Sequence, residues 1–319
     1  MSFEQLMQHA RDIQQKAIEK SLEQHGVRRA PRPGQPALSP MPLEAEKRQQ
    51  IEQSFSDIPG LFRPFSEMPI PASFDGMIDD LSHALRMLSA GQDPKDPING
   101  TIYTSNTNLD KLSGSESYVE HWTGRAAMEF KSNFIDPFPS VVRNQFIIAA
   151  VLKSALEAQR EIWVKARNDI DKIAHDALEA LDRMDDCGKN EWTMTFTVVA
   201  SVAAIAAVPL TGGASLTVAA LAVTAVGAAS QVAAAAAPDD PPKIQFSGET
   251  AEAVVSQLRE AMSKLVELIG GQEAKISYAL TNTHSLVTGG REGFVSKRPA
   301  LAAATARDVR GPEYMGYST

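Results

Sequence analysis

A tract of 46 residues, 192–237, contains no charged residue and no histidine, and 17 of its residues are alanine. We call these residues the apolar tract. A continuous apolar surface of that size does not stand in water on a free monomer, because large exposed apolar patches mark an interface or a membrane site. The apolar tract must therefore be covered by another copy of the chain, by a partner or by lipid.

One proline and two glycines, residues that interrupt regular secondary structure, divide the apolar tract into two arms. Pro209, Gly212 and Gly213 separate residues 192–208 from residues 214–237. Each arm is close to the roughly 20 residues that a helix needs to cross hydrocarbon. The pattern therefore predicts an apolar helical hairpin with its turn at these three residues.

Two environments fit this hairpin. Alanine and other small residues let helices approach closely, in lipid or in a tight protein bundle. The flanking acidic pairs Asp185–Asp186 and Asp239–Asp240 favour a soluble assembly, because membrane hairpins more often carry basic anchors on the cytoplasmic side. Either environment predicts that the full-length chain is not a stable free monomer.

Two long segments flank the apolar tract and carry apolar residues at alternating steps of three and four. This 3.5-residue repeat over 141–187 and 249–287 predicts two long helices with coiled-coil seams that pack on each other or on copies of themselves. The polar residues Gln159 and Gln272 share the seams, and Gly270–Gly271 predicts a local bend. The seam residues are Trp163, Ile170, Ile173, Leu258, Leu265, Ile269 and Ile276.

The remaining pattern also indicates helices. Aromatic residues make up only 6% of the chain, which favours helix-on-helix packing. No segment is assigned as an alternating strand, and the proline-rich stretch 57–74 is expected to form an irregular strap with Phe62, Phe65 and Phe74. The predicted class is all-α: an elongated helical bundle with long antiparallel coiled-coil-like helices and the apolar hairpin. Further helices are expected at 3–25, 43–55, 75–88, 106–120 and from 124.

Three regions are expected along the chain. Residues 1–72 form an N-terminal helix and a proline-rich linker, and residues 73–290 form the bundle with the apolar hairpin. Residues 291–319 form a flexible tail, as the glycines from Thr288 on together with Pro299 and Pro312 suggest.

The residues that carry chemistry show no catalytic pattern. The net charge of −8 argues against nucleic acid as a partner, since phosphate binding needs a basic stripe. Cys187 is the single cysteine, and the six histidines are dispersed, so no zinc spacing occurs. No phosphate loop, metalloprotease motif or nucleophile elbow is present. We therefore expect no enzyme, no cofactor and no metal.

A tryptophan beside a glycine marks one helix boundary. In "WTGRAAMEF", Gly124 gives backbone freedom for a tight turn, and Thr123 is the expected N-cap of the following helix. Trp122 is expected to pack across the corner between two helices, while its indole N–H reaches an end carbonyl. Ala127 and Phe130 follow at helical spacing.

This stretch resembles the WxG turn of type VII (ESX) secretion substrates of actinobacteria, including the longer PPE- and Esp-like helical members. The resemblance covers about a dozen residues and implies a turn between antiparallel helices that contributes to an export signal. The chain departs from the family pattern in two respects. The motif follows a long N-terminal extension, and Tyr-x-x-x-Asp/Glu is missing after the paired helix.

Three functions follow as expectations. The first is a non-catalytic helical protein, exported by or associated with a type VII-like system, that self-assembles or binds a protein partner at the cell envelope. The second is a membrane-inserting or pore-forming protein that uses the apolar tract, and the third is a cytosolic or phage coiled-coil scaffold. The N-terminus lacks the pattern of a Sec signal peptide, so the expected location is secreted or envelope-associated without such cleavage, or else cytoplasmic.

Overall fold

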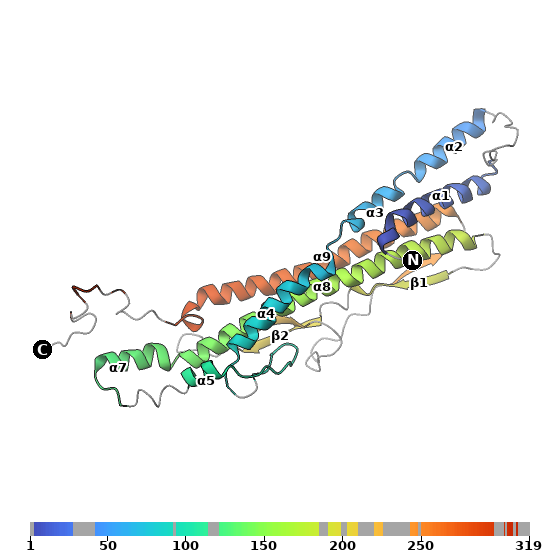
Figure 1. Cartoon of the computed structure of the whole chain (residues 1–319). Helices are drawn as coiled ribbons and strands as arrows, with labels where there is room; N and C mark the ends of the chain where they lie inside the picture. The colour runs from blue at the N-terminus through green and yellow to red at the C-terminus, as the bar shows by residue number, and fades with distance from the viewer. Residues whose placement is uncertain are drawn as a thin grey trace. The chain divides into compact units, whose positions relative to one another are not determined.

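In the computed structural model, most of the secondary-structure elements are helices (Figure 1). The described residues are 3–27, 42–91, 94–113, 121–184, 191–198, 203–209, 220–225, 243–247, 250–296, 303, 305–308 and 311. The chain packs into two compact units, each built from three segments. Unit 1 comprises Met1–Ser73, Gln159–Ser201 and Pro238–Ala274, and unit 2 comprises Phe74–Ala158, Val202–Ala237 and Lys275–Thr319.

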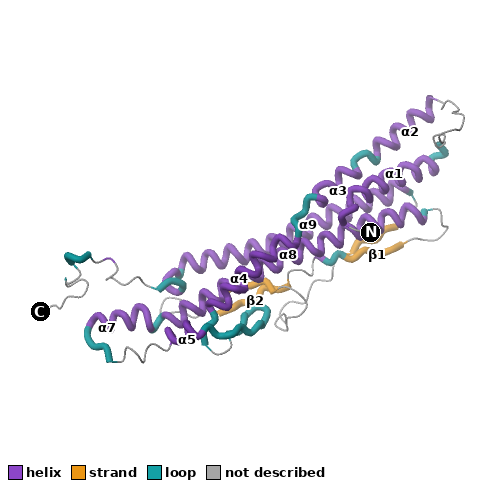
Figure 2. Tube along the Cα trace, viewed as in Figure 1, coloured by secondary structure: helices purple, strands orange, loops and turns teal. Residues whose placement is uncertain are grey.

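The helical bundle expected from the sequence is confirmed. Figure 2 separates the helices from the few strands. The α-helices are α1 (Leu6–Gln24), α2 (Pro42–Ser54), α3 (Ile58–Ser66), α4 (Asp75–Leu88), α5 (Thr107–Ser113), α7 (Arg125–Phe130), α8 (Phe138–Arg183) and α9 (Ala251–Gly289). Short helical turns are η1 (Phe3–Gln5), η2 (Pro71–Phe74), η3 (Lys131–Ile135, π-helical) and η5 (Arg291–Gly293), and the strands are β1 (Glu191–Thr195), β2 (Ala203–Pro209), β3 (Ala220–Ala225) and β4 (Lys243–Ser247).

The two long helices lie where the heptad pattern places them. α8 covers most of the predicted range 141–187, and α9 matches the predicted range 249–287. α9 continues through Gly270 and Gly271, both of which are exposed. A Cβ added at either glycine would meet no heavy atom within 4 Å, so neither glycine is required by packing.

We expect Gly270→Ala and Gly271→Ala each to raise the free energy of unfolding by about 0.5–1 kcal/mol, because alanine loses less backbone entropy than glycine in a helix interior. Urea denaturation of the single and double variants measures this gain. Gly124→Ala is the matched contrast, since Gly124 has a φ of 100° and the same substitution there introduces strain. A loss of stability at residue 270 or 271 would contradict the continuous helix.

In unit 1, α1 buries one stripe of its surface. Its fully or almost fully buried side chains are Leu6, Ala10, Ile13, Ala17 and Leu22. The chain turns after the helix at Gly26, whose φ of 66° is in the left-handed region that glycine tolerates. The N–H of Val27 donates to the carbonyl of Leu22, which closes the end of α1.

The proline-rich strap expected at 57–74 is largely helical, so this part of the sequence prediction is wrong. α3 accommodates one proline in its first turn, where no backbone donor is needed, and Pro64 in its interior. The expected packing of aromatic side chains is nevertheless present. Phe62 is 0% exposed and Phe65 is 5% exposed.

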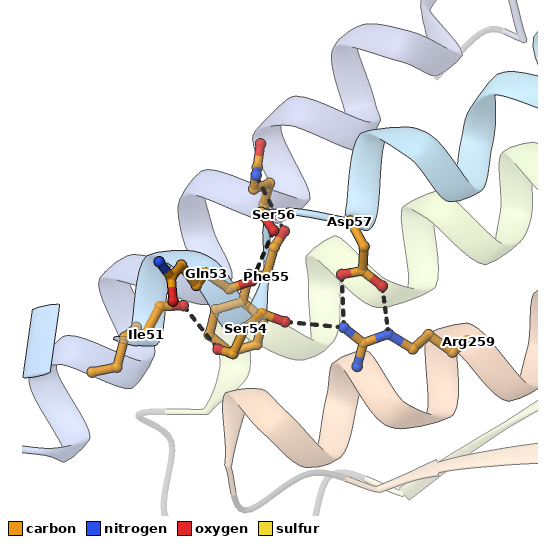
Figure 3. A network of polar contacts seen from close by, with 8 residues as sticks. Ile51, Gln53, Ser54, Phe55, Ser56, Asp57 and Arg259 are labelled. Carbon is orange, nitrogen blue, oxygen red and sulfur yellow. Dashed lines mark hydrogen bonds and ion pairs between the residues drawn. The ribbon is translucent and has the colours of Figure 1, made fainter. Parts of the chain in front are cut away.

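Arg259 of α9 ties the junction of α2 and α3 to the bundle (Figure 3). Its Nη2 donates to Asp57 Oδ1 at 2.8 Å and to the carbonyl of Ser54 at 3.1 Å, while its Nε donates to Asp57 Oδ2 at 3.1 Å. The hydrogen bond from the guanidinium lowers the pKa of Asp57 from its ordinary value, against a smaller opposing effect of burial. This bidentate contact fixes the orientation of the junction more than it stabilises the fold, because both side chains are partly in water.

The predicted seams of α8 and α9 supply much of the apolar core. Ile170, Ile173, Leu258 and Leu265 are 0% exposed; Ile269 and Ile276 are buried, and Trp163 is half-buried. Within unit 1, Gln159 Nε2 of α8 donates to Glu273 Oε1 of α9 at 2.8 Å. Gln272 is buried on α9, as its seam position predicts.

Unit 2 has its own apolar cluster, made by α4, the loop that follows it, α8 and the end of α9. Its buried members include Leu85, Ile98, Tyr103, Phe146 and Phe294. Asn144 Nδ2 donates to the carbonyl of Gly293 at 2.9 Å, and Gln145 Nε2 donates to the carbonyl of Phe294 at 2.7 Å. The first residues of the expected flexible tail are therefore anchored to α8.

Candidate functional site: the attachment of the apolar tract

The apolar tract does not form the predicted helical hairpin in its described residues. It contains β2 and β3, which pair antiparallel with Ala206 opposite Val223 and Val208 opposite Leu221. Pro209, expected at the turn, is the last residue of β2. Gly212 and Gly213 lie outside the described residues.

A second ladder pairs the start of the apolar tract with residues that follow the tract in the sequence. β1 pairs antiparallel with β4, with Thr193 opposite Gln245 and Met194 opposite Ile244. We call this ladder the neck. The neck thus joins, within unit 1, the residues where the tract begins to residues that follow its end.

Three apolar side chains hold the start of the tract in the core of unit 1. Met194, Phe196 and Val198 are all 0% exposed, whereas Thr193 and Thr197 are exposed. The alternation of buried and exposed side chains in β1, which ends at Thr195, thus continues through Val198. Burial of a Phe or Met side chain contributes about 1.5–3 kcal/mol relative to exposure, so these anchors are a substantial part of the attachment.

A buried carboxylate on α8 receives the backbone that follows the neck. Asp169 is 1% exposed. Its Oδ2 accepts from the N–H of Thr197 and of Val198, each at 2.9 Å, and its Oδ1 accepts from the Thr197 N–H at 3.1 Å and from Thr197 Oγ1 at 2.8 Å. We call Asp169 with Thr197 and Val198 the latch.

Burial raises the pKa of Asp169 from its ordinary value, and this effect exceeds the lowering by the hydrogen bonds from Thr197 and Val198 and by the charge of Lys172. Burying the charged carboxylate of Asp169 is therefore costly, but both of its oxygens accept hydrogen bonds within the latch. If the contact opened without water entering, the carboxylate and its donors would be left without hydrogen-bond partners, which costs free energy.

The sequence contained signals for both the neck and the latch that the helical prediction missed. "WTMTFTV" alternates apolar residues with threonine across 192–198, a period of two that is typical of a half-buried strand. Asp169 lies beside the seam residue Ile170, and an acid next to a buried seam needs a hydrogen-bond partner. The sequence could not identify that partner, because Thr197 and Val198 meet Asp169 only in the tertiary structure.

The Trp-Thr-Gly turn precedes α7. Gly124 has φ 100° and ψ 170°, a region essentially restricted to glycine, so the predicted need for backbone freedom agrees with the structure. Gly124, and not Thr123, is the N-cap of α7, and no side chain caps the helix. The expected N-cap role of Thr123 is therefore wrong. Residues 114–120, the end of the preceding helix of the predicted corner, lie outside the described residues.

Trp122 is not a buried anchor, because 60% of its surface is exposed. Its ring lies 5.8 Å from that of Phe130, which in turn lies 5.2 Å from Phe134, and Phe134 lies 5.7 Å from Phe138. The three phenylalanines are half-buried, as is Ala127. The turn thus begins a row of aromatic contacts along α7, η3 and the start of α8.

Two further observations concern chemistry and membranes. Among the helices that the structure describes, none combines the length and apolar character needed to cross a membrane. In the described part of the chain, no group of three or more His, Cys, Asp or Glu side chains is arranged to hold a metal ion. Cys187 lies outside the described residues.

No family model matches this chain, and neither a curated protein nor a solved structure matches it.

Proposed function

We propose that this protein acts without a catalytic site, as a helical bundle that presents the apolar tract to a lipid membrane. The observation that carries the proposal is the attachment of the tract. A charge-free segment of 46 residues sits between two long helices, and a β-ladder closes its base. An element of this kind can leave its resting position while the helices that carry it remain folded.

The resting strands are not the form that would enter hydrocarbon. β2 has 7 residues and β3 has 6, shorter than the roughly 9–11 residues of a membrane-spanning strand. An open two-stranded sheet would also leave backbone groups unpaired in lipid, where only closed hydrogen bonding is tolerated. Alanine, the commonest residue of the tract, has the highest helix propensity and is depleted in strands. In lipid we therefore propose that the two arms adopt the helices that the sequence predicts.

Vesicle flotation tests this function directly. Full-length protein is mixed with phosphatidylcholine vesicles that contain a dye, and both co-flotation and dye release are measured. We expect wild type to float with the vesicles, and helical circular dichroism to increase on binding. Dye release distinguishes pore formation from insertion without a pore.

A charged variant supplies the specificity test. Val208 and Leu221 are register partners in β2 and β3. We expect Val208→Asp/Leu221→Asp to reduce flotation at least tenfold, because Leu221 lies inside the second arm, and an Asp costs up to about 2.5–3.5 kcal/mol as it approaches the centre of a membrane helix. Val266→Asp is the matched control, since Val266 is 57% exposed on α9 outside the tract. Wild type that stays with the soluble fraction would contradict the proposal.

In solution without lipid, the apolar tract must be buried against protein. We propose that the full-length chain self-associates or pairs with a protein partner in solution, because so large an apolar segment is an interface on any monomer. Sedimentation measures the native mass with and without detergent. A compact monomer that needs no detergent and ignores vesicles would refute both the assembly and the membrane function.

A second candidate function is favoured by the Trp-Thr-Gly turn. Gly124 holds a glycine-specific conformation, and Trp122 is exposed in contact with Phe130. These features support a role of the turn in recognition more than in folding. They fit a substrate of a type VII-like secretion system that reaches the cell envelope or the medium, in line with the WxG resemblance.

Two variants separate recognition from folding at this turn. We expect Trp122→Ala to cost about 1 kcal/mol or less in unfolding free energy, because mainly one aromatic contact is lost. Gly124→Ala is expected to cost about 1–3 kcal/mol through backbone strain. Secretion of Trp122→Ala at the wild-type level, by a host carrying such a system, would exclude the export role.

A further inference from the structure

The latch divides the attachment of the apolar tract into a polar and an apolar half. The polar half is the Asp169 carboxylate with the backbone and hydroxyl donors of Thr197 and Val198. The apolar half is the buried set Met194, Phe196 and Val198. Both halves act within two or three residues of the point where the chain leaves the neck.

The two halves respond differently to opening. Water replaces the hydrogen bonds on both sides of the polar half, because Asp169 and the amides of Thr197 and Val198 can all be solvated once separated. Water does not replace the contacts of Phe196 and Val198, since exposing apolar surface to water is unfavourable. A lipid phase removes that obstacle, because it accepts apolar side chains.

From this asymmetry we infer that the latch controls release of the apolar tract: opening of the contact between Asp169 and Thr197–Val198 is the step that frees the tract for the bilayer. The inference rests on the membrane function proposed above and adds the residues that regulate it. Asp169 is a positioning residue in this scheme, because it holds the tract and does not itself enter lipid.

The position of Asp169 suits this role. It lies on the buried side of α8 next to Ile170, in a helix that continues far beyond it in both directions. Both carboxylate oxygens accept hydrogen bonds, and among the described residues their donors are Thr197 and Val198. Opening the latch therefore breaks a set of bonds that joins α8 to the tract, without breaking those of the helix itself.

Two variants weaken the latch in different ways, and both are made in the full-length chain. Thr197→Val removes the Oγ1–H donor and keeps a side chain of similar shape. Asp169→Asn removes the charge and keeps one acceptor oxygen. Their matched controls are Thr193→Val, at an exposed threonine of β1, and Asp182→Asn, at an exposed aspartate of α8.

The first readout needs no lipid. Hydrogen exchange is followed by mass spectrometry on peptides that cover residues 194–198. We expect the Thr197 and Val198 amides to exchange about tenfold faster in each latch variant, the size of effect that losing one hydrogen bond to a charged group produces. The two controls should exchange as wild type does. Unchanged exchange in both latch variants would overturn the inference.

The second readout is the rate of association with phosphatidylcholine vesicles, measured in a stopped-flow instrument. We expect both latch variants to associate several-fold faster than wild type and both controls to match it. If wild type binds vesicles but the latch variants bind at the same rate, the latch inference is overturned and the membrane function stands. If wild type does not bind vesicles at all, the proposed function fails, and the release role fails with it.

Discussion

Replacing Phe62 by alanine is expected to lower the free energy of unfolding by about 3–5 kcal/mol, because the side chain is fully buried and its loss leaves a cavity in the core of unit 1. Phe62 lies on α3, which packs on α1. The expected effect is large relative to the stability of a typical domain. Urea denaturation followed by circular dichroism measures it.

The control for this prediction is Ile70→Ala. Ile70 follows α3 closely in the sequence but is 64% exposed, so its truncation should change the unfolding free energy by no more than about 0.5 kcal/mol. Similar losses for the two substitutions would contradict the burial of Phe62. Such a result would also support the irregular strap that the prolines of segment 57–74 predict.

Replacing Asp169 by alanine is expected to cost about 2–3 kcal/mol of unfolding free energy, because the amides of Thr197 and Val198 lose their acceptor next to buried apolar side chains. Urea denaturation of the full-length chain measures the loss. Asp182→Ala on the same helix is the control, since Asp182 is exposed and its ion pair with Lys16 is worth little. Equal stability of Asp169→Ala and wild type would mean that the latch does not hold the tract.

The pH dependence of the same site has a definite sign. The pKa of Asp169 is raised in the folded state, so the folded chain binds this proton more tightly than the unfolded chain does. The contribution of the group is therefore fully present below its ordinary pKa near 3.8 and is lost as pH rises through the folded value. Relative to Asp169→Asn, which does not titrate, wild type should gain stability as the pH falls from 7 toward 4. A relative loss of stability on acidification would mean that the hydrogen bonds from Thr197 and Val198 outweigh burial.

The long helices could be predicted from the sequence because their information is local and repeated. The seam residues of α8 and α9 recur every three or four positions, and the burial of Ile170, Ile173, Leu258 and Leu265 follows from that period alone. α4 also occupies the predicted range, since its apolar residues lie on one stripe. The glycine-specific conformation of Gly124 was readable for the same reason, as a property of a single residue in its turn.

Other features depended on contacts that no local pattern contains. The prolines of α3 argued against a helix, but one of them lies in the first turn, and burial of Phe62 and Phe65 outweighs the cost of Pro64. Trp122 was expected to pack into a corner. Its exposure depends on which elements lie beside the turn, and the sequence near the turn does not specify them.

The apolar tract shows this division most clearly. Its sequence alone determined that 46 residues without charge need a cover, because the free energy of exposing them depends only on composition and area. The secondary structure of its first residues was decided by tertiary contacts. Alanine favours helix locally, whereas β1 gains hydrogen bonds from β4, which lies beyond the far end of the tract, and Thr197 and Val198 gain an acceptor from Asp169. Such partners are distant in sequence, and their hydrogen bonds together with the burial of Met194 and Phe196 exceed the small helix preference of each residue.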